Sequence, residues 1–188
     1  MQEAVPLGEG TMAPIFRLTG EQVDGVCESV RQDTGGVVES AGYNAPDLNV
    51  ISGDKASVTE AMARCKDLRG NATEIAVSAP FHCALMRLAA ERLARRLKDV
   101  AVGSMAMPYI PNVNAELELE PLNIVGHLVD QVCAPVRWLP TVQTMLDMGV
   151  DEFYEVGPGN VLCGFIRRCD RALKPTPVGD PRGRKLFE

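Results

Sequence analysis

The chain has 188 residues, of which 46% are hydrophobic and 23% are charged, and its formal net charge is −6. A chain of this length and composition buries a core as one globular domain or as two small ones. An acidic surface does not neutralise phosphate groups, so the charge excludes a general nucleic-acid binder and we expect no nucleic-acid partner.

The cysteine spacing and the hydropathy pattern indicate where the protein works. Six cysteines are scattered without a Cys-x-x-Cys pair and only two histidines accompany them, so we expect no metal site and free thiols in a reducing compartment. No apolar run approaches the roughly 18 residues of a transmembrane helix, and the N-terminus does not have the pattern of a signal peptide. We therefore expect a cytoplasmic protein without a membrane partner, and an organelle matrix fits the same features.

The first half of the chain predicts the element order β-α-β-β-α-β. Residues 1–10 contain glycine and proline without apolar periodicity and are expected to be a connection. Strands are predicted at 12–18, 37–43, 48–52 and 73–77, and helices at 21–31, with Thr19 as N-cap, and at 57–68. This order is typical of a ferredoxin-like unit, an antiparallel sheet with both helices on one face, which we place at residues 11–78.

The second half predicts mostly helices. A long amphipathic helix follows His82 and reaches Asp99. A strand is predicted at 105–110, helices at 122–132 and 138–148, a short strand at 152–156, and a last helix after a glycine turn. From residue 174 onward three prolines and two glycines predict a mobile tail, 174–188, so residues 79–173 form the second unit.

His82 is the first candidate for chemistry. It lies where the predicted strand 73–77 stops at Pro80 and the long helix begins, and such junctions commonly carry catalytic groups. A single histidine is also common as a structural residue, and no G-x-S-x-G elbow supplies a nucleophile in this sequence. The neighbouring Cys83 would diverge from His82 and is interpreted as a packing residue.

The turn Gly157-Pro158-Gly159-Asn160 is a second candidate. At a helix N-terminus it would present free backbone amides to an anion or a substrate, whereas a tight turn that simply requires glycine is the plainer explanation.

Charged clusters form a third group. Basic residues on two helices suit either a solvated face or the docking of an acidic partner, and they include Arg87, Arg167, Arg168 and Arg171. The alternating Glu116, Glu118 and Glu120 are interpreted as a solvated edge rather than as paired catalytic carboxylates.

Six separated stretches, spread over residues 1–173, occur in the same order in one enzyme family. They are Met1–Pro6 with Met12-Ala13, Tyr43–Pro46 with Val50–Gly53, Ser78–His82, Asn112–Ala115, Pro135–Trp138 and Tyr154–Gly159. With them the chain resembles the C-terminal part of the malonyl-CoA:acyl-carrier-protein transacylases, which are acyltransferases. The resemblance implies an α/β fold, namely the C-terminal part of an α/β-hydrolase-like acyltransferase with an inserted ferredoxin-like small subdomain.

The same resemblance implies a reaction. A malonyl group would pass from malonyl-CoA to the phosphopantetheine thiol of acyl carrier protein, in fatty acid or polyketide synthesis, by a Ser-His ping-pong mechanism without a bound cofactor. His82 matches the general base and acid, and a main-chain carbonyl at Gln131 would orient it. Asn112 and the Gly157 to Asn160 turn would line the cleft. If the basic clusters dock an acidic partner, the arginines at 87, 167, 168 and 171 would bind the carrier protein. Phe81 beside His82 favours malonyl as the acyl group.

The nucleophilic serine, the oxyanion-hole glutamine and the malonyl-binding arginine of the family precede the point where Met1 falls. We therefore expect no turnover by this chain alone, because removing the nucleophile costs about 10⁶-fold in comparable Ser-His systems. Three interpretations stay open: an N-terminal half encoded upstream, a separately encoded N-terminal half that acts as a partner, and a non-catalytic carrier-protein-binding module or truncated inactive homologue.

Overall fold

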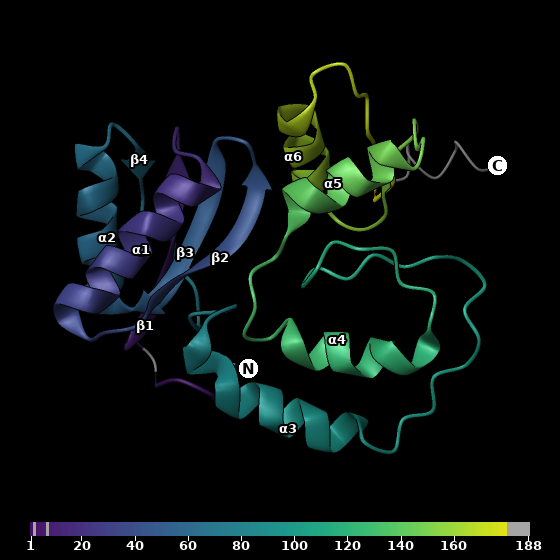
Figure 1. Cartoon of the computed structure of the whole chain (residues 1–188), viewed down its shortest axis with the longest axis horizontal. Helices are drawn as coiled ribbons and strands as arrows, with labels where there is room; N and C mark the ends of the chain where they lie inside the picture. Colours follow the sequence, from purple (N-terminus) through teal and green to yellow (C-terminus); the bar gives the residue numbers. More distant parts are fainter. Residues whose placement is uncertain (2, 7, 180–188) are drawn as a thin grey trace.

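The computed structural model describes residues 1, 3–6 and 8–179. Over these residues the chain is mixed α/β, and its two halves differ in kind (Figure 1). The first half is a sheet with two helices on one face, whereas the second half consists of helices joined by long loops.

The sheet of the first half has the strand order β2-β3-β1-β4, and every neighbouring pair is antiparallel. Helices α1 and α2 cover one face of this sheet (Figure 1). The predicted order of elements is confirmed. Their bounds are β1 Gly10–Phe16, α1 Gly20–Thr34, β2 Val38–Ala45, β3 Leu48–Asp54, α2 Lys55–Asp67 and β4 Asn71–Ala72.

Helix α1 begins and ends where local chemistry dictates. The Thr19 hydroxyl accepts from the Gln22 N–H, and the Gln22 side chain accepts from the Thr19 N–H, which is a capping box. At the other end Gly35 adopts a φ of 69° and donates its N–H to the Arg31 carbonyl. The predicted N-cap is therefore confirmed. The apolar face of α1 packs with Ile15 and Ile51 in the largest hydrophobic cluster.

The fourth strand differs from the prediction. Only Asn71 and Ala72 pair with β1, and beyond them Ile75 makes a single bridge to Met12. Residues 73–76 are exposed, so the β-branched run predicted at 73–77 has no buried face to hold it in the sheet. The chain leaves the sheet here and turns toward His82.

The second half contains α3 Arg87–Leu97, α4 Ile124–Asp130, α5 Trp138–Asp147 and α6 Val161–Cys169, with short 3₁₀ turns at Ala84–Met86 and Pro121–Asn123. The prediction of a strand at 105–110 is wrong, because in this segment Tyr109 makes only one isolated bridge, to Glu118. The two-residue β5 Tyr154–Glu155 pairs in parallel with β6 Thr176–Pro177.

This pairing corrects the start of the predicted tail, since Thr176 and Pro177 are hydrogen-bonded to the rest of the fold. Residues 180–188 of that tail lie outside the described residues. Within the described part of the chain, no helix has both the length and the apolarity to cross a membrane.

One backbone connection joins the two halves at the edge of the sheet. The Val136 N–H donates to the Ala41 carbonyl at 2.9 Å, and the Tyr43 N–H donates to the Val136 carbonyl at 2.9 Å. Val136 thus extends the sheet beside the edge strand β2. The sheet face opposite α1 and α2 is thereby turned toward α5, α6 and the His82 turn.

Candidate active site

His82 lies in a tight turn between the sheet and α3. Pro80 is buried against the backbone of Gly10, where an added Cβ would lie 2.4 Å from Pro80 Cγ. His82 itself has a φ of 61°, a left-handed conformation that costs a non-glycine residue about 1–2 kcal/mol. The Cys83 thiol donates to the Pro80 carbonyl at 3.2 Å across the turn. The surrounding structure therefore holds the imidazole in place against a local strain.

The imidazole is oriented by a main-chain carbonyl. His82 Nδ1 lies 2.8 Å from the Gln131 carbonyl oxygen, 49 residues away in sequence. A carbonyl oxygen only accepts, so this contact assigns the proton to Nδ1 and leaves the Nε2 lone pair free. An imidazole in this tautomer can take a proton from a hydroxyl or a thiol.

Gln131 follows α4, and its own position is well supported. Its N–H donates to the His127 carbonyl at 3.0 Å, and its side-chain oxygen accepts from the Asn112 amide at 3.4 Å. The His127 imidazole in turn lies 3.0 Å from the Glu118 carboxylate. That contact, with N–H donors from Glu120 and Asn123, lowers the pKa of Glu118 to about 2.

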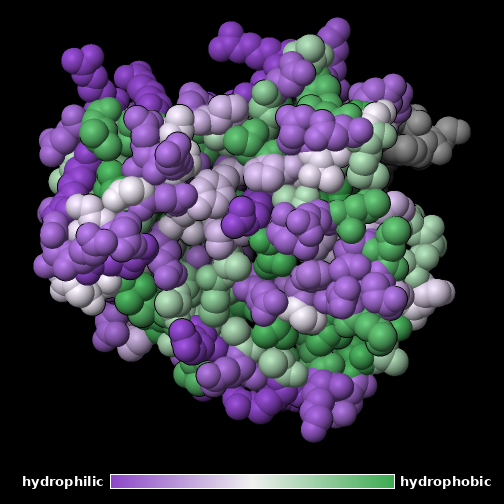
Figure 2. Space-filling view, viewed as in Figure 1, coloured by the Kyte–Doolittle hydropathy of each residue, from purple (hydrophilic) through white to green (hydrophobic). Residues whose placement is uncertain are grey.

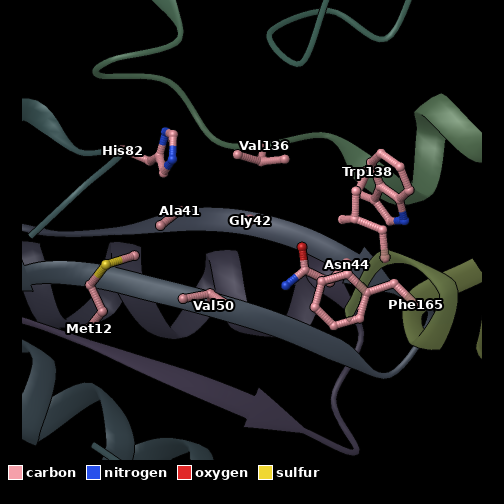
Figure 3. Close-up of a pocket in the computed structure, with 10 residues that line it drawn as sticks. Met12, Ala41, Gly42, Asn44, Val50, His82, Val136, Trp138 and Phe165 are labelled. Atoms are coloured by element: carbon pink, nitrogen blue, oxygen red, sulfur yellow. The ribbon is translucent and has the colours of Figure 1, made fainter. Parts of the chain in front are cut away.

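A cavity of about 190 Å³ opens beside His82 on the sheet face (Figure 3). It is mostly apolar, and the His82 imidazole and the Asn44 amide are among its few polar groups. The indole of Trp138 and the ring of Phe165 stand at the end away from His82 (Figure 3). The lining residues are Met12, Ala41, Gly42, Asn44, Val50, His82, Val136, Trp138, Leu162 and Phe165.

Sequence reasoning assigned no role to Asn44, Trp138 and Phe165. They come from three different elements, and only the tertiary fold brings them to one cavity. Asn44 and Trp138 do fall within two of the six stretches that carried the resemblance, so those stretches contained the available signal.

The Gly157-Pro158-Gly159-Asn160 turn does not line this cavity, although Leu162 just after it does. We expected free N–H groups at this helix start, but the structure shows two of them occupied. The Glu155 carboxylate accepts from the N–H groups of Leu162 and Cys163 at 3.1 and 2.8 Å. Partial burial raises the pKa of Glu155, but these backbone donors outweigh it and lower the pKa. Glu155 thus occupies the start of α6, where an anion was expected.

Asn112 also lies outside the cavity lining, and its amide contacts the Gln131 side chain instead. Cys83 is buried, and burial raises the pKa of its thiol, so it is a poor nucleophile beside His82. Among the described residues, no group of three or more His, Cys, Asp or Glu side chains is placed to hold a metal ion.

The four arginines occupy two separate places. Arg167, Arg168 and Arg171 are exposed on and just after α6, whereas Arg87 begins α3, on the opposite side of the molecule in Figure 1. Arg168 donates to the Asp47 carboxylate at 3.1 Å and lies 5.8 Å from the centre of the Phe16 ring. The structure therefore brings three of the predicted docking residues together and leaves Arg87 apart.

Comparison with known proteins relates this arrangement to one group of enzymes. The chain is 40% identical over 181 residues to the malonyl CoA-acyl carrier protein transacylase of Haemophilus influenzae and 38% identical over 182 residues to that of Escherichia coli K12. Each alignment covers 96% of this chain, but only 57% and 58% of those relatives. No protein-family model matches the chain.

Solved structures agree with the sequence comparison. The transacylase of the same name from Clostridium perfringens is 37% identical with a TM-score of 0.94, over 100% of this chain and 58% of that one. A holo type II PKS acyl-carrier protein in complex with its malonyl-transacylase gives 38% identity and a TM-score of 0.92, over 97% and 59%. The chain is thus similar in sequence and fold to malonyl transacylases and spans about three fifths of their length.

Proposed function

We propose that this chain, which shares sequence and fold with malonyl CoA-acyl carrier protein transacylases over nearly all its length, supplies the histidine side of malonyl transfer. One observation carries the proposal: the His82 imidazole, oriented by the Gln131 carbonyl at 2.8 Å, borders a largely apolar cavity. The substrates would be malonyl-CoA and the phosphopantetheine thiol of acyl carrier protein, in fatty acid or polyketide synthesis. These names are those of the similar enzymes.

In the proposed reaction, His82 Nε2 takes the proton of a serine hydroxyl while the serine oxygen attacks the thioester carbonyl of malonyl-CoA. The C–S bond then breaks, and the imidazolium returns its proton to the leaving CoA thiolate. In the second half, His82 takes the proton of the phosphopantetheine thiol, whose sulfur attacks the malonyl ester, and the serine regains a proton. The Gln131 carbonyl would stabilise the imidazolium between these steps.

The serine is proposed to come from a polypeptide segment outside these 188 residues, since they contain no G-x-S-x-G elbow. The architecture proposed for the assembled enzyme follows from this. Residues 11–78 would be the ferredoxin-like small subdomain, and residues 79–173 would be the C-terminal part of an α/β-hydrolase-like large subdomain. The antiparallel strand order β2-β3-β1-β4 supports the first assignment. We further propose a cytoplasmic location and no resident cofactor.

A malonyl-transfer assay tests the proposal. The chain would be combined with a transacylase segment that carries the elbow serine, and the transfer of labelled malonyl from malonyl-CoA to holo acyl carrier protein would be measured. We expect transfer by the mixture, none by the chain alone, and none by the mixture with His82→Ala. Circular dichroism would verify that the variant is folded. Undiminished transfer by folded His82→Ala would reject the role assigned to His82.

A second candidate is a non-catalytic module that binds acyl carrier protein. The exposed arginines of α6 favour it, because carrier proteins that dock on basic surfaces are themselves acidic. Titration calorimetry with holo acyl carrier protein would measure this binding. We expect about a tenfold loss of affinity for the double charge reversal Arg167→Glu with Arg171→Glu, and no loss for the control Lys66→Glu on α2. Arg87→Glu shows whether α3 shares the docking surface, and equal affinity of all variants would exclude docking through α6.

A further inference from the structure

A carboxylate on the sheet holds the turn that carries His82. Glu39 projects from β2, and its Oε2 accepts from the Ala84 N–H at 2.7 Å. The two residues are 45 positions apart in sequence. The contact is short and charge-assisted, which places it among the stronger hydrogen bonds of a fold. Ala84 is only two residues from His82, so the bond ties the histidine turn directly to the sheet.

The position of Glu39 on the sheet explains why its carboxylate can reach the Ala84 N–H. Its neighbour Val38 is buried in the cluster beneath α1, and strand side chains alternate between faces, so Glu39 points to the opposite face. That is the face on which Ala41 lines the cavity beside His82. Glu39 is partly buried there, and water competes less for its carboxylate than at an open surface.

The His82 turn requires such an anchor. The left-handed φ of 61° at His82 would relax in a free turn, and relaxation would move Nδ1 away from the Gln131 carbonyl. Gln131 belongs to the α4 side of the molecule, whereas Glu39 belongs to the sheet. The turn is thus held from two independent elements, and the imidazole is positioned between them.

The geometry points to Glu39 as a positioning residue for His82: its carboxylate fixes the turn so that the Nδ1 proton is directed to Gln131 and Nε2 stays free for proton transfer. This inference rests on the proposed function for its catalytic consequence. The predicted tautomer of His82 is a property of the chain itself and can be measured without any turnover.

Long-range ¹H–¹⁵N NMR of the full chain reads the tautomer of each histidine. The chain has two, and His127, which pairs with Glu118, is an internal reference. We expect His82 in the native chain to show the Nδ1–H form. In Glu39→Ala its ¹⁵N shifts should move toward those of a free imidazole that exchanges between tautomers, while those of His127 stay unchanged.

Two conservative variants separate positioning from general stability. Glu39→Gln keeps an oxygen that can accept from Ala84 and should restore the native shifts, whereas Glu39→Asp keeps the charge, retracts the oxygen and should not. Thr19→Ala, which removes a helix-start acceptor from α1 on the other sheet face, is the matched control and should lower stability without moving the His82 shifts. Native His82 shifts in both Glu39→Ala and Glu39→Asp would overturn the inference, and if Glu39→Ala does not fold, the contrast between Gln and Asp decides.

In the complemented transfer assay, Glu39→Ala should lower kcat about 10- to 100-fold with little change in KM, since misplacing a catalytic group costs rate rather than binding. Glu39→Gln should recover most of it. No transfer by the unmodified mixture would count against the proposed function but leave the NMR result to decide on Glu39. A native kcat in folded Glu39→Ala would count against Glu39 alone.

Discussion

Glu118 shows how far a residue's role can depart from its sequence pattern. In the alternating acidic run it was interpreted as part of a solvated edge, and that interpretation is wrong. Its carboxylate accepts from the N–H groups of Leu119 and Glu120, contacts the Asn123 amide at 2.9 Å, and lies 3.0 Å from His127 Nε2. The Glu118 carboxylate therefore fastens the loop that precedes α4, the helix after which Gln131 follows.

The lowered pKa of Glu118 predicts an acid-labile part of the stability. Its pKa is about 2 in the folded chain against an ordinary value of 4.5, chiefly through the His127 contact. A carboxylate whose pKa is lowered by folding stabilises the folded chain. That stabilisation is fully present above the pKa of the unfolded chain and is lost as the pH falls toward the pKa of the folded chain. Glu118→Gln should therefore weaken the fall in the urea midpoint between pH 4.5 and 2. Glu116→Gln, an exposed neighbour, should keep the native slope, and identical slopes for all three proteins would contradict the prediction.

At the scale of elements, two glycines that each lie inside a helix or a strand differ in whether their neighbours leave room for a side chain. Gly25 lies inside α1, and an added Cβ there would meet nothing within 4 Å. Gly53 lies in β3 opposite Val38, and an added Cβ would come within 1.9 Å of the Val37 carbonyl oxygen. The first glycine only weakens its helix, whereas the second permits close approach of two strands.

Alanine substitutions at these two positions should shift stability in opposite directions. Gly25→Ala should raise the free energy of unfolding by about 0.5–1 kcal/mol, since glycine is that much poorer than alanine inside a helix. Gly53→Ala should lower it by about 1–3 kcal/mol through overpacking. Urea unfolding followed by far-UV circular dichroism measures both, because the single Trp138 lies in another cluster. A stabilising Gly53→Ala would show that the strands can separate without cost.

At the scale of the whole molecule, the buried hydrophobic residues that the structure describes form three clusters of unequal size. The largest joins the sheet to α1 and α2, the second packs α3 against the N-terminal segment and residues 132–133 after α4, and the third holds α5 with α6. Figure 2 shows apolar surface gathered over the region of α3 and α4, in contrast to the hydrophilic surface over α1. Large apolar side chains exposed in the second half include Leu88, Val100, Leu119, Leu122 and Val156.

This division predicts unequal protection from hydrogen exchange in the isolated chain. Helix α3 has a single buried residue, Ala89, so it should open at low free energy, whereas β1, β3 and α1 should exchange only on unfolding of the largest cluster. Hydrogen–deuterium exchange with mass spectrometry should show faster exchange in residues 87–97 than in 10–34. Equal protection of the two segments would mean that the chain unfolds as one unit.

The sequence by itself determined the features that depend on residues close together in the chain. The capping box at Thr19 and the apolar face of α1 use residues within one or two helical turns, and the six stretches marked His82 through a family resemblance. The strand at 105–110 failed because periodicity does not reveal whether a partner strand exists.

The family resemblance named the Gln131 carbonyl as the partner of His82, and only the tertiary structure decided the other groups that surround the histidine. Its Nδ1 partner Gln131 comes 49 residues later in the sequence, and Glu39, which anchors the turn, comes 45 residues before Ala84. These contacts arise because separate elements pack together. No local sequence pattern shows which carbonyl or carboxylate will lie within hydrogen-bond distance of the turn. The histidine and its carbonyl partner were therefore identifiable through the family resemblance, whereas the Glu39 anchor and the cavity beside His82 were set by the fold.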